Sequence, residues 1–189
     1  MQEDIAAVTW VLDPRARARG RSCVLFAGFH KRTGQHAAVK RLAGGYGGAR
    51  AEVEALLRLA HPSVNRLLDV HVTPAGVDLV LEWAEGTLER AGLPLPPDAL
   101  ARGWVRGLFQ ALAHVHERGF VHADVKPANL LVVRGRLVLG DFGSCRAART
   151  PGPVSAPLYR APELLLGEPL AAPSADVWAA GASAPRARH

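Results

Sequence analysis

The side chains best suited to chemistry lie in one short stretch, VHADVKPANLLVVRGRLVLGDFG, at residues 121–143. Asp124, Lys126 and Asn129 lie within six residues, and Asp141 follows twelve residues after Asn129. Carboxylate and amide oxygens are ligands that Mg²⁺ prefers, and a lysine ammonium is a compact charge for a phosphate. In phosphoryl transfer a protein mainly positions the reactants and neutralises charge. These four side chains are therefore a sufficient set for that chemistry.

Two apolar runs separate Asn129 from Asp141 and are typical of paired strands. Residues 130–133 and 137–139 are rich in Leu and Val, and Arg134-Gly135-Arg136 joins them with a glycine at the turn. This pattern predicts a β-hairpin. Because a hairpin folds back on itself, Asn129 and Asp141 should flank its open end, where a site of oxygen ligands for Mg²⁺ would form.

Three motifs, in this order and spacing, resemble the signature sequences of eukaryotic protein kinases. They are HADVKPAN at residues 122–129, Asp141-Phe142-Gly143 and Ala161-Pro162-Glu163, which resemble the catalytic loop, the metal-binding triplet and the end of the activation segment. An Ala-Val-Lys upstream that ends at Lys40, and Asp176-Val177-Trp178 downstream, complete the series. The Lys-Pro-x-Asn form resembles the serine/threonine class.

Two further stretches are similar to the cyclin-dependent and related proline-directed kinases. They are LYR at residues 158–160 and HPSVNRLLDV at residues 61–70. The resemblance implies an α+β, bilobal fold, with a small antiparallel β-sheet and one helix in the N-lobe and a mainly helical, incomplete C-lobe. It implies an N-lobe at residues 1–83, a partial C-lobe at residues 84–181 and a divergent basic tail at residues 182–189.

The resemblance also implies a role for each candidate residue, with ATP and Mg²⁺ as cofactors. Asp124 would orient the substrate hydroxyl, and Lys126 would steady the γ-phosphate. Asn129 and Asp141 would bind Mg²⁺. Lys40 would contact the α- and β-phosphates. The substrate would be a serine or threonine of another protein, and the similarity to proline-directed kinases implies one followed by proline.

In this family the lysine at position 40 also pairs with a glutamate of a neighbouring helix. Spacing back from His61-Pro62 selects Glu52 rather than Glu54, and the alternative is that both glutamates lie on a solvated helix face. Glu82 and Ala84 would bond the adenine edge through their backbone. The apolar residues around the nucleotide would be core in any fold. The resemblance implies a nucleotide site made by Gly20, Val24, Leu25, Ala38, Glu82, Ala84 and Leu131.

The stretch expected to cover the phosphates departs from the family. The family has three glycines there, whereas residues 18–23 of this chain contain only Gly20. Because Ala18 and Cys23 restrict the backbone, this departure weakens the expectation of nucleotide affinity. Arginines at positions 15, 17, 19 and 21 could compensate as phosphate partners or serve as a nuclear-import patch, and the alternative is a solvated basic turn.

Apolar periodicity and turn residues place the other elements. A Gly-rich stretch at residues 44–48 predicts a flexible linker before a helix. In a later helix Leu100, Trp104, Leu108, Leu112 and Val115 form one apolar stripe. The predicted strands are residues 8–12, 23–28, 35–42 and 77–83, and the predicted helices are residues 49–59 and 98–118, after a stiff connector at residues 93–97.

The activation segment shows two departures. Ala123 stands where many relatives have an arginine that receives a loop phosphate, so phosphorylation at Thr150 or Ser155 would have only Arg146 or Arg50 as a partner. We therefore expect weak or absent control by loop phosphorylation. Ala156 occupies the place of a family threonine that supports the catalytic residues.

The end of the chain departs most. An apolar helix pattern stops at Pro185, and the later C-lobe helices of the family are missing from the sequence. We expect exposed apolar surface as a result. Two hypotheses follow. The chain is either an active serine/threonine kinase, or a truncated or pseudokinase-type binding module with weak or no activity.

Composition adds further expectations. The 189 residues carry a formal charge of +6, but the arginines are mostly scattered and no recognition motif accompanies them, so we do not expect nucleic acid as a partner. No helix signature supports a cyclin-type partner, and no apolar stretch is long enough for a membrane. Two cysteines, Cys23 and Cys145, are too few for a disulfide framework, which favours a cytoplasmic or nuclear location.

Overall fold

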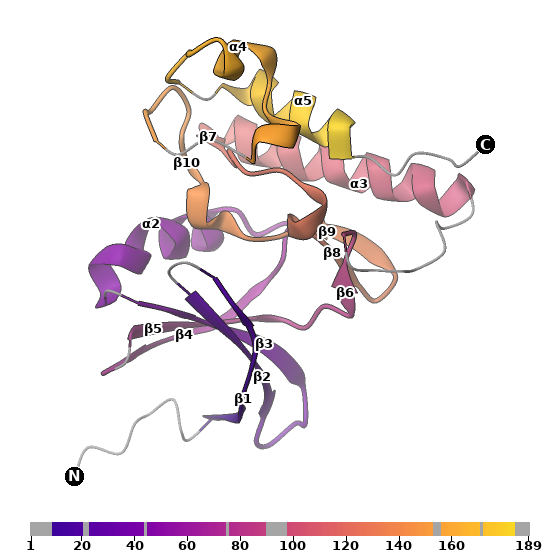
Figure 1. Cartoon of the computed structure of the whole chain (residues 1–189). Coiled ribbons are helices and arrows are strands. Elements are labelled where there is room, and N and C mark those ends of the chain that lie inside the picture. Colours follow the sequence, from indigo (N-terminus) through magenta and orange to yellow (C-terminus); the bar gives the residue numbers. More distant parts are fainter. Residues whose placement is uncertain are drawn as a thin grey trace. The chain divides into compact units, whose positions relative to one another are not determined.

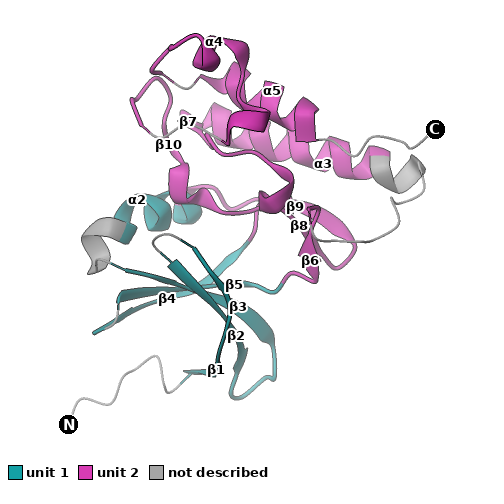
Figure 2. Cartoon of the chain, viewed as in Figure 1, with its two compact units in different colours: residues 1–57, 66–83 teal, residues 58–65, 84–189 magenta. Residues whose placement is uncertain are grey.

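The computed structural model describes residues 9–20, 23–43, 45–74, 76–89, 98–152, 156–170 and 172–183, without the side chains of residues 45–48 and 98–101. The chain divides into two compact units (Figure 2). Unit 1 comprises residues 1–57 and 66–83, and unit 2 comprises residues 58–65 and 84–189. The predicted connector at residues 93–97, Ser155 and the tail after residue 183 lie outside the described residues.

Unit 1 is built on a five-stranded antiparallel sheet with the strand order β1-β2-β3-β5-β4 (Figure 1). The three predicted N-terminal strands and the strand before the lobe boundary are present. β4 follows from alternating side chains in LLDVHVT that the sequence reading did not single out. The strands are β1 (Trp10–Arg19), β2 (Cys23–His30), β3 (His36–Leu42), β4 (Leu67–Thr73) and β5 (Gly76–Glu82).

The register of the sheet separates two rows of side chains. Leu25 of β2 pairs with Lys40 of β3, and the neighbouring pair is Val24 with Arg41. Because paired residues of antiparallel strands share a face and successive residues alternate, Lys40 and Arg41 lie on opposite faces. The face of Arg41 also carries a small apolar core that includes Trp10, Val39 and Val80.

Helix α2 (Gly45–Arg58) begins earlier than the sequence predicted. Residues 45–48, predicted to be a flexible linker, form its first turn, so that prediction was wrong. Each glycine inside a helix lowers the stability of the helix by about 0.5–1 kcal/mol relative to alanine, but glycine can still adopt helical backbone angles. Ala49, Val53 and Leu56 recur at helical spacing and are buried, so packing of this face stabilises the helix.

In unit 2, helix α3 (Asp98–Glu117) carries the predicted apolar stripe. Trp104, Leu108, Leu112 and Val115 are all buried, while the side chain of Leu100 lies outside the described residues. Gly119 follows the helix with a φ of +78°, a conformation that favours glycine and ends helices. Helix α5 (Pro173–Ser183) packs against α3 (Figure 1), so the predicted helix at Asp176 is present.

The predicted hairpin is formed by β8 (Leu130–Val133) and β9 (Arg136–Leu139). Arg134 and Gly135 make a two-residue turn with φ angles of +49° and +73°, as in a type I′ turn, so Arg136 belongs to the strand rather than to the turn. β6 (Gly86–Thr87) joins the other edge of β8. The remaining elements are β7 (Phe120–Val121), η1 (Pro127–Asn129), η2 (Phe142–Ser144), β10 (Arg146–Ala147), η3 (Pro157–Tyr159) and α4 (Pro162–Leu165).

Candidate functional site

Three of the predicted side chains meet in the loop between β7 and β8, residues 122–129, which we call the catalytic loop. Lys126 Nζ lies 2.7 Å from Asp124 Oδ2, and Asn129 Nδ2 donates to the same oxygen at 3.0 Å. Asn129 Nδ2 also donates to the carbonyl oxygen of Asp124 at 2.8 Å. The short helix η1 turns the chain back so that these residues converge. The ammonium of Lys126 and the amide of Asn129 thus fix the orientation of the Asp124 carboxylate through one of its two oxygens.

His122 supports the loop from the core and is fully buried. Its Nδ1 accepts from the N–H of Asp124 at 3.3 Å, so Nε2 carries the hydrogen and donates to the carbonyl oxygen of Gly140 at 3.0 Å. The imidazole also meets the ring of Phe142 edge-on, with centroids 4.9 Å apart. His122 therefore packs against the core and orients the loop.

The sequence reading missed the role of Asp176 at the start of α5. Its carboxylate is buried and accepts from the N–H groups of His122 and Ala123, both at 2.8 Å. His116 Nε2 lies 2.9 Å from the same carboxylate. Ala123 has a φ of +62°, a strained value for a residue with a side chain, and the bond to Asp176 helps to hold it. The signals in the sequence were the Asp176-Val177-Trp178 motif and an acidic residue in the first turn of a helix, and neither gave the partners of the carboxylate.

Asn129 and Asp141 lie at the open end of the hairpin. The N–H of Gly140, next to Asp141, donates to the carbonyl oxygen of Asn129 at 2.9 Å. Asp141 has a φ of +56°, and its carboxylate accepts from the N–H of Gly143 at 3.4 Å. Since the amide nitrogen of Asn129 is turned towards Asp124, its oxygen is the atom suited to a metal. The donor set fits Mg²⁺, which commonly takes one or two protein oxygens and completes its shell with phosphate and water.

Within the described part of the chain, no group of three or more His, Cys, Asp or Glu residues could hold a metal ion by itself. A metal at Asn129 and Asp141 would take its remaining ligands from phosphate oxygens or water.

In unit 1, Lys40 and Glu52 form a buried ion pair. The Lys40 Nζ to Glu52 Oε1 distance is 2.7 Å, and the two residues are 9% and 6% exposed. Glu54 instead pairs with Arg50 of the same helix at 2.7 Å, where both side chains are exposed. Lys40 thus pairs with Glu52, the glutamate that the sequence spacing selected, and only Glu54 lies on a solvated helix face. Removing one partner of the buried pair would leave a desolvated charge.

The residues predicted to surround a nucleotide are only partly brought together in unit 1. Leu25 and Ala38 share the sheet face of Lys40, whereas Val24 lies on the opposite face. Gly20 follows β1, and its N–H donates to the carbonyl oxygen of Cys23 at 2.8 Å. The placement of Val24 differs from the expectation because neighbouring residues of a strand alternate between faces.

Glu82 and Ala84 fall in different units. The N–H of Glu82, at the end of β5, donates to the carbonyl oxygen of Arg66 at 2.8 Å. Ala84 begins the part of unit 2 in which the N–H of Glu85 donates to the carbonyl oxygen of Val132 at 2.9 Å. Leu131 pairs with Thr87 in the same small sheet. Unit 2 therefore brings Leu131 close to the segment after Ala84.

Arg19, directly before Gly20, lies away from the face of Lys40. β1 runs through Arg19, which pairs with Val24 and so shares the face of Arg41. Arg15 and Arg17 are exposed, but register shifts between Leu12 and Ala16 and between Ala16 and Ala18 interrupt the alternation, so their face does not follow from that of Arg19. The placement of Arg19 argues against the suggestion that this side chain replaces a missing glycine as a phosphate partner. The suggested role of Arg21 concerns a residue outside the described part.

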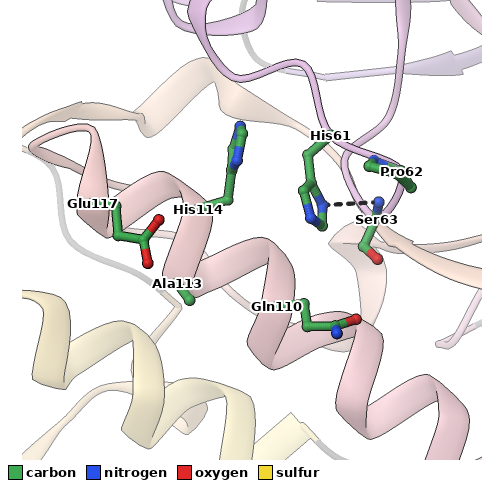
Figure 3. A pocket seen from close by; sticks show the side chains of 7 residues that line it. All are labelled: His61, Pro62, Ser63, Gln110, Ala113, His114 and Glu117. Carbon is green, nitrogen blue, oxygen red and sulfur yellow. Dashed lines mark hydrogen bonds between the residues drawn. The ribbon is translucent and has the colours of Figure 1, made fainter.

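A cavity of about 420 Å³ lies between α3 and the segment at residues 61–63 (Figure 3). The rings of His61 and His114 lie against each other there, with centroids 4.7 Å apart and planes tilted by 40°. Burial lowers the pKa of both imidazoles, and Arg118 lowers both further. None of the predicted catalytic residues lines this cavity. Its lining consists of His61, Pro62, Ser63, Gln110, Ala113, His114 and Glu117.

No helix in the described residues is both long enough and apolar enough to cross a membrane. This finding concerns the helices alone.

Comparisons with known proteins agree with the motifs. The family described as Protein kinase domain matches residues 18–184. Cyclin-dependent kinase F-4 of Oryza sativa subsp. japonica is 34% identical over 81% of this chain and 36% of the relative. Cell division control protein 2 homolog 2 of Trypanosoma brucei brucei is 42% identical over 69% of this chain and 41% of the relative. Maternal embryonic leucine zipper kinase of Danio rerio is 35% identical over 82% of this chain and 25% of the relative. The chain thus spans well under half the length of these relatives.

Proposed function

Because this chain belongs to the protein kinase family, we propose that it transfers the γ-phosphate of ATP to a serine or threonine hydroxyl of a protein. The observation that carries the proposal is the geometry at Asp124. Lys126 and Asn129 both bond Oδ2, at 2.7 Å and 3.0 Å, which leaves Oδ1 to accept the hydrogen of a substrate hydroxyl. The Lys-Pro-x-Asn form of this loop supports a hydroxyl of serine or threonine as the acceptor.

In this proposal Lys126 has two roles that its position supports. Its ammonium neutralises charge on the transferred phosphate, and it fixes the orientation of the Asp124 carboxylate. Asn129 and Asp141 are the residues that would hold Mg²⁺, through their side-chain oxygens. A metal held there would supply positive charge that neutralises the phosphate oxygens.

Lys40 contacts the α- and β-phosphates of ATP, and Glu52 holds the ammonium of Lys40 in place. The buried ion pair supports this role because a lysine that is already oriented loses little freedom when the nucleotide binds. Leu25, Ala38 and Leu131 contact the base, while Glu82 and Ala84 bond its edge through the backbone. Gly20 lets the chain approach the phosphates. Val24 supports this site from the other sheet face rather than by contact.

The preferred substrate has proline after the serine or threonine. Arg160, directly before Ala161-Pro162-Glu163, resembles the residue that shapes a pocket for that proline. Two of the similar proteins are named as a cyclin-dependent kinase and a cell division control protein, which supports this group. Neither name says which partner this chain needs, and a cyclin-type partner is no part of the proposal.

The test is transfer of labelled phosphate from Mg·ATP to paired peptides that contain Ser-Pro or Ser-Ala. Asp124→Asn keeps the size of the side chain and its contacts but cannot accept the proton, so activity should fall by roughly 10²- to 10⁴-fold. The Ser-Pro peptide should be the better substrate. Equal, low incorporation with the original chain and with Asp124→Asn would rule out this catalytic role.

A binding module without turnover is the second candidate, favoured by the single glycine in residues 18–23. The two candidates differ in what ATP does. An ATP-dependent rise in melting temperature without transfer to any protein would support the binding module, because binding to the folded state stabilises it without chemistry. Measurable transfer that Asp124→Asn abolishes would exclude it.

A further inference from the structure

We propose that Arg146 is a positioning residue that holds residues 144–152, here named the clamp segment, beside the catalytic loop without any phosphate. The catalytic consequence rests on the proposed kinase function, whereas the clamp itself is a structural claim that can be measured separately. All of the contacts that support it lie within unit 2.

The guanidinium of Arg146 joins the two ends of the clamp segment. Nη1 donates to the carbonyl oxygen of Ser144 at 3.0 Å, and Nε donates to the carbonyl oxygen of Thr150 at 3.0 Å. One rigid, planar group therefore fixes two main-chain carbonyls that are six residues apart. Because both acceptors are main-chain oxygens, neither bond depends on modification of a side chain.

Gly152 allows the chain to pass directly over this group. A Cβ at position 152 would lie 2.9 Å from Nε of Arg146 and 3.1 Å from its Cζ. Nη2 is buried and has no hydrogen-bond partner in the described part of the chain. A buried donor without a partner is unfavourable. The two carbonyl bonds and the contact with Gly152 are therefore the interactions that keep the guanidinium in this position.

The clamp segment is attached to the strand that leads into the catalytic loop. In the β10–β7 pair Arg146 lies opposite Val121, and the N–H of Ala148 donates to the carbonyl oxygen of Gly119 at 2.9 Å. Val121 and Ala123 are buried, and Ala148 packs against them. Ala123 stands where the family resemblance would place an arginine that receives a phosphate. Apolar packing occupies that position here, and Arg146 bonds the backbone instead.

Three substitutions distinguish two roles for Arg146, a clamp on main-chain carbonyls and a receptor for a phosphate group. Arg146→Lys keeps the positive charge but loses the fork that reaches two carbonyls. Gly152→Ala keeps Arg146 and places a methyl group against it. Thr150→Ala is the matched control, because it removes the hydroxyl that could be phosphorylated and keeps the carbonyl that Arg146 bonds.

Hydrogen–deuterium exchange of the full chain measures the clamp without any need for activity. The reporters are the N–H groups of Ala148 and Thr150, which donate to the carbonyl oxygens of Gly119 and Ala147. We expect exchange at these amides to be roughly tenfold faster in Arg146→Lys and Gly152→Ala, which corresponds to the loss of one or two hydrogen bonds. Exchange in Thr150→Ala should equal that of the original chain.

Activity gives a second readout. Misplacement of the clamp segment should lower kcat by roughly 10- to 100-fold in Arg146→Lys and Gly152→Ala, because small shifts near reacting groups have large effects on rate. The KM for ATP should change little, since the residues proposed to hold the nucleotide are not touched. Thr150→Ala and phosphatase-treated original chain should retain full kcat.

The outcomes are distinguishable. Unchanged exchange in Arg146→Lys would overturn the clamp. A comparable loss of protection or activity in Thr150→Ala, or after phosphatase treatment, would overturn it in favour of a phosphate receptor. If the original chain transfers no phosphate but Arg146→Lys and Gly152→Ala still speed exchange, the proposed kinase function fails and the clamp stands.

Discussion

Single residues in this protein hold charged side chains in fixed orientations. Both donors that reach Asp124 bond Oδ2, so among the described residues Oδ1 is the oxygen that can face a hydroxyl. Lys40 is held in a comparable way by Glu52. The bond between Lys126 and Asp124 is partly buried, and the bond between Lys40 and Glu52 is buried. Each fixes the orientation of a charged side chain, which would limit the rearrangement needed when a reactant binds.

Replacing Glu52 by glutamine should show how much this pairing contributes. Glu52→Gln removes the carboxylate from a buried ammonium, so we expect the KM for ATP to rise or kcat to fall by roughly 10-fold or more, and stability to fall by about 3 kcal/mol. Steady-state kinetics and denaturant unfolding check both effects.

The matched control is Glu54→Gln, because Glu54 pairs with Arg50 at the surface. Exposed pairs contribute about 0–1 kcal/mol, so this variant should behave almost as the original chain. If Glu52→Gln and Glu54→Gln were equally mild, the proposed role of the buried pair would be wrong.

At the scale of elements, short segments lock the catalytic loop to its neighbours. β7 enters the loop, η1 closes it, and the start of α5 provides Asp176 to bond its backbone. A second contact between elements lies at the cavity in Figure 3, where the segment at residues 61–63 meets α3 through the His61–His114 pair. Burial lowers the pKa of both imidazoles in this contact.

The stability of the chain should fall as the pH drops below about 6.5. The pKa of His61 and that of His114 are both lowered from 6.5 by burial, then by Arg118, and the pKa of His114 also by His61, while Glu117 opposes the shift for His114. Below 6.5 the unfolded chain therefore takes up protons that the folded chain does not, which favours unfolding. The loss is complete once the pH is below the lowered pKa values.

Urea unfolding at pH 7.5 and pH 5.5 measures this effect. The difference in unfolding free energy between the two pH values should shrink in His114→Phe, which fills the same space without a titrating group. It should persist in His36→Asn, because His36 is exposed on β3. An equal pH dependence in His114→Phe and the original chain would contradict the assignment.

The molecule as a whole leaves large apolar side chains in water. Leu158, Leu166 and Trp178 of unit 2 are 87%, 88% and 53% exposed. Ala161, Leu164 and Ala175 form a buried cluster that joins α4 to α5, so these exposed side chains come from neighbouring elements. Exposed apolar surface of this kind favours association, as the sequence led us to expect.

The chain as given should therefore self-associate as its concentration rises. Leu166→Gln together with Trp178→Gln should reduce association, because the two substitutions remove apolar area that is already exposed. Sedimentation velocity across a range of concentrations measures the change. Leu57→Gln is the control, since Leu57 is 66% exposed but belongs to unit 1. Association that is insensitive to the double substitution would show that other surfaces drive it.

The sequence by itself determined the family, the fold class and most of the elements. Local chemistry is the reason. The spacing of Asp124, Lys126 and Asn129, the hairpin signal at Gly135 and the stripe on α3 all depend on residues close together in the chain. Errors arose where packing overrode local preference, as in the glycine-rich first turn of α2. The roles of the candidate residues stay predictions until they are measured.

Only the tertiary structure decided which distant groups meet. It buried the Lys40–Glu52 pair and left Glu54 with Arg50 at the surface, placed Val24 and Arg19 on the face opposite Lys40, and brought Asp176 to the backbone of His122 and Ala123. It also turned Arg146 towards two main-chain carbonyls. Sequence spacing carries no record of such contacts, because they depend on strand register, on positive φ angles and on the packing of elements far apart in the chain.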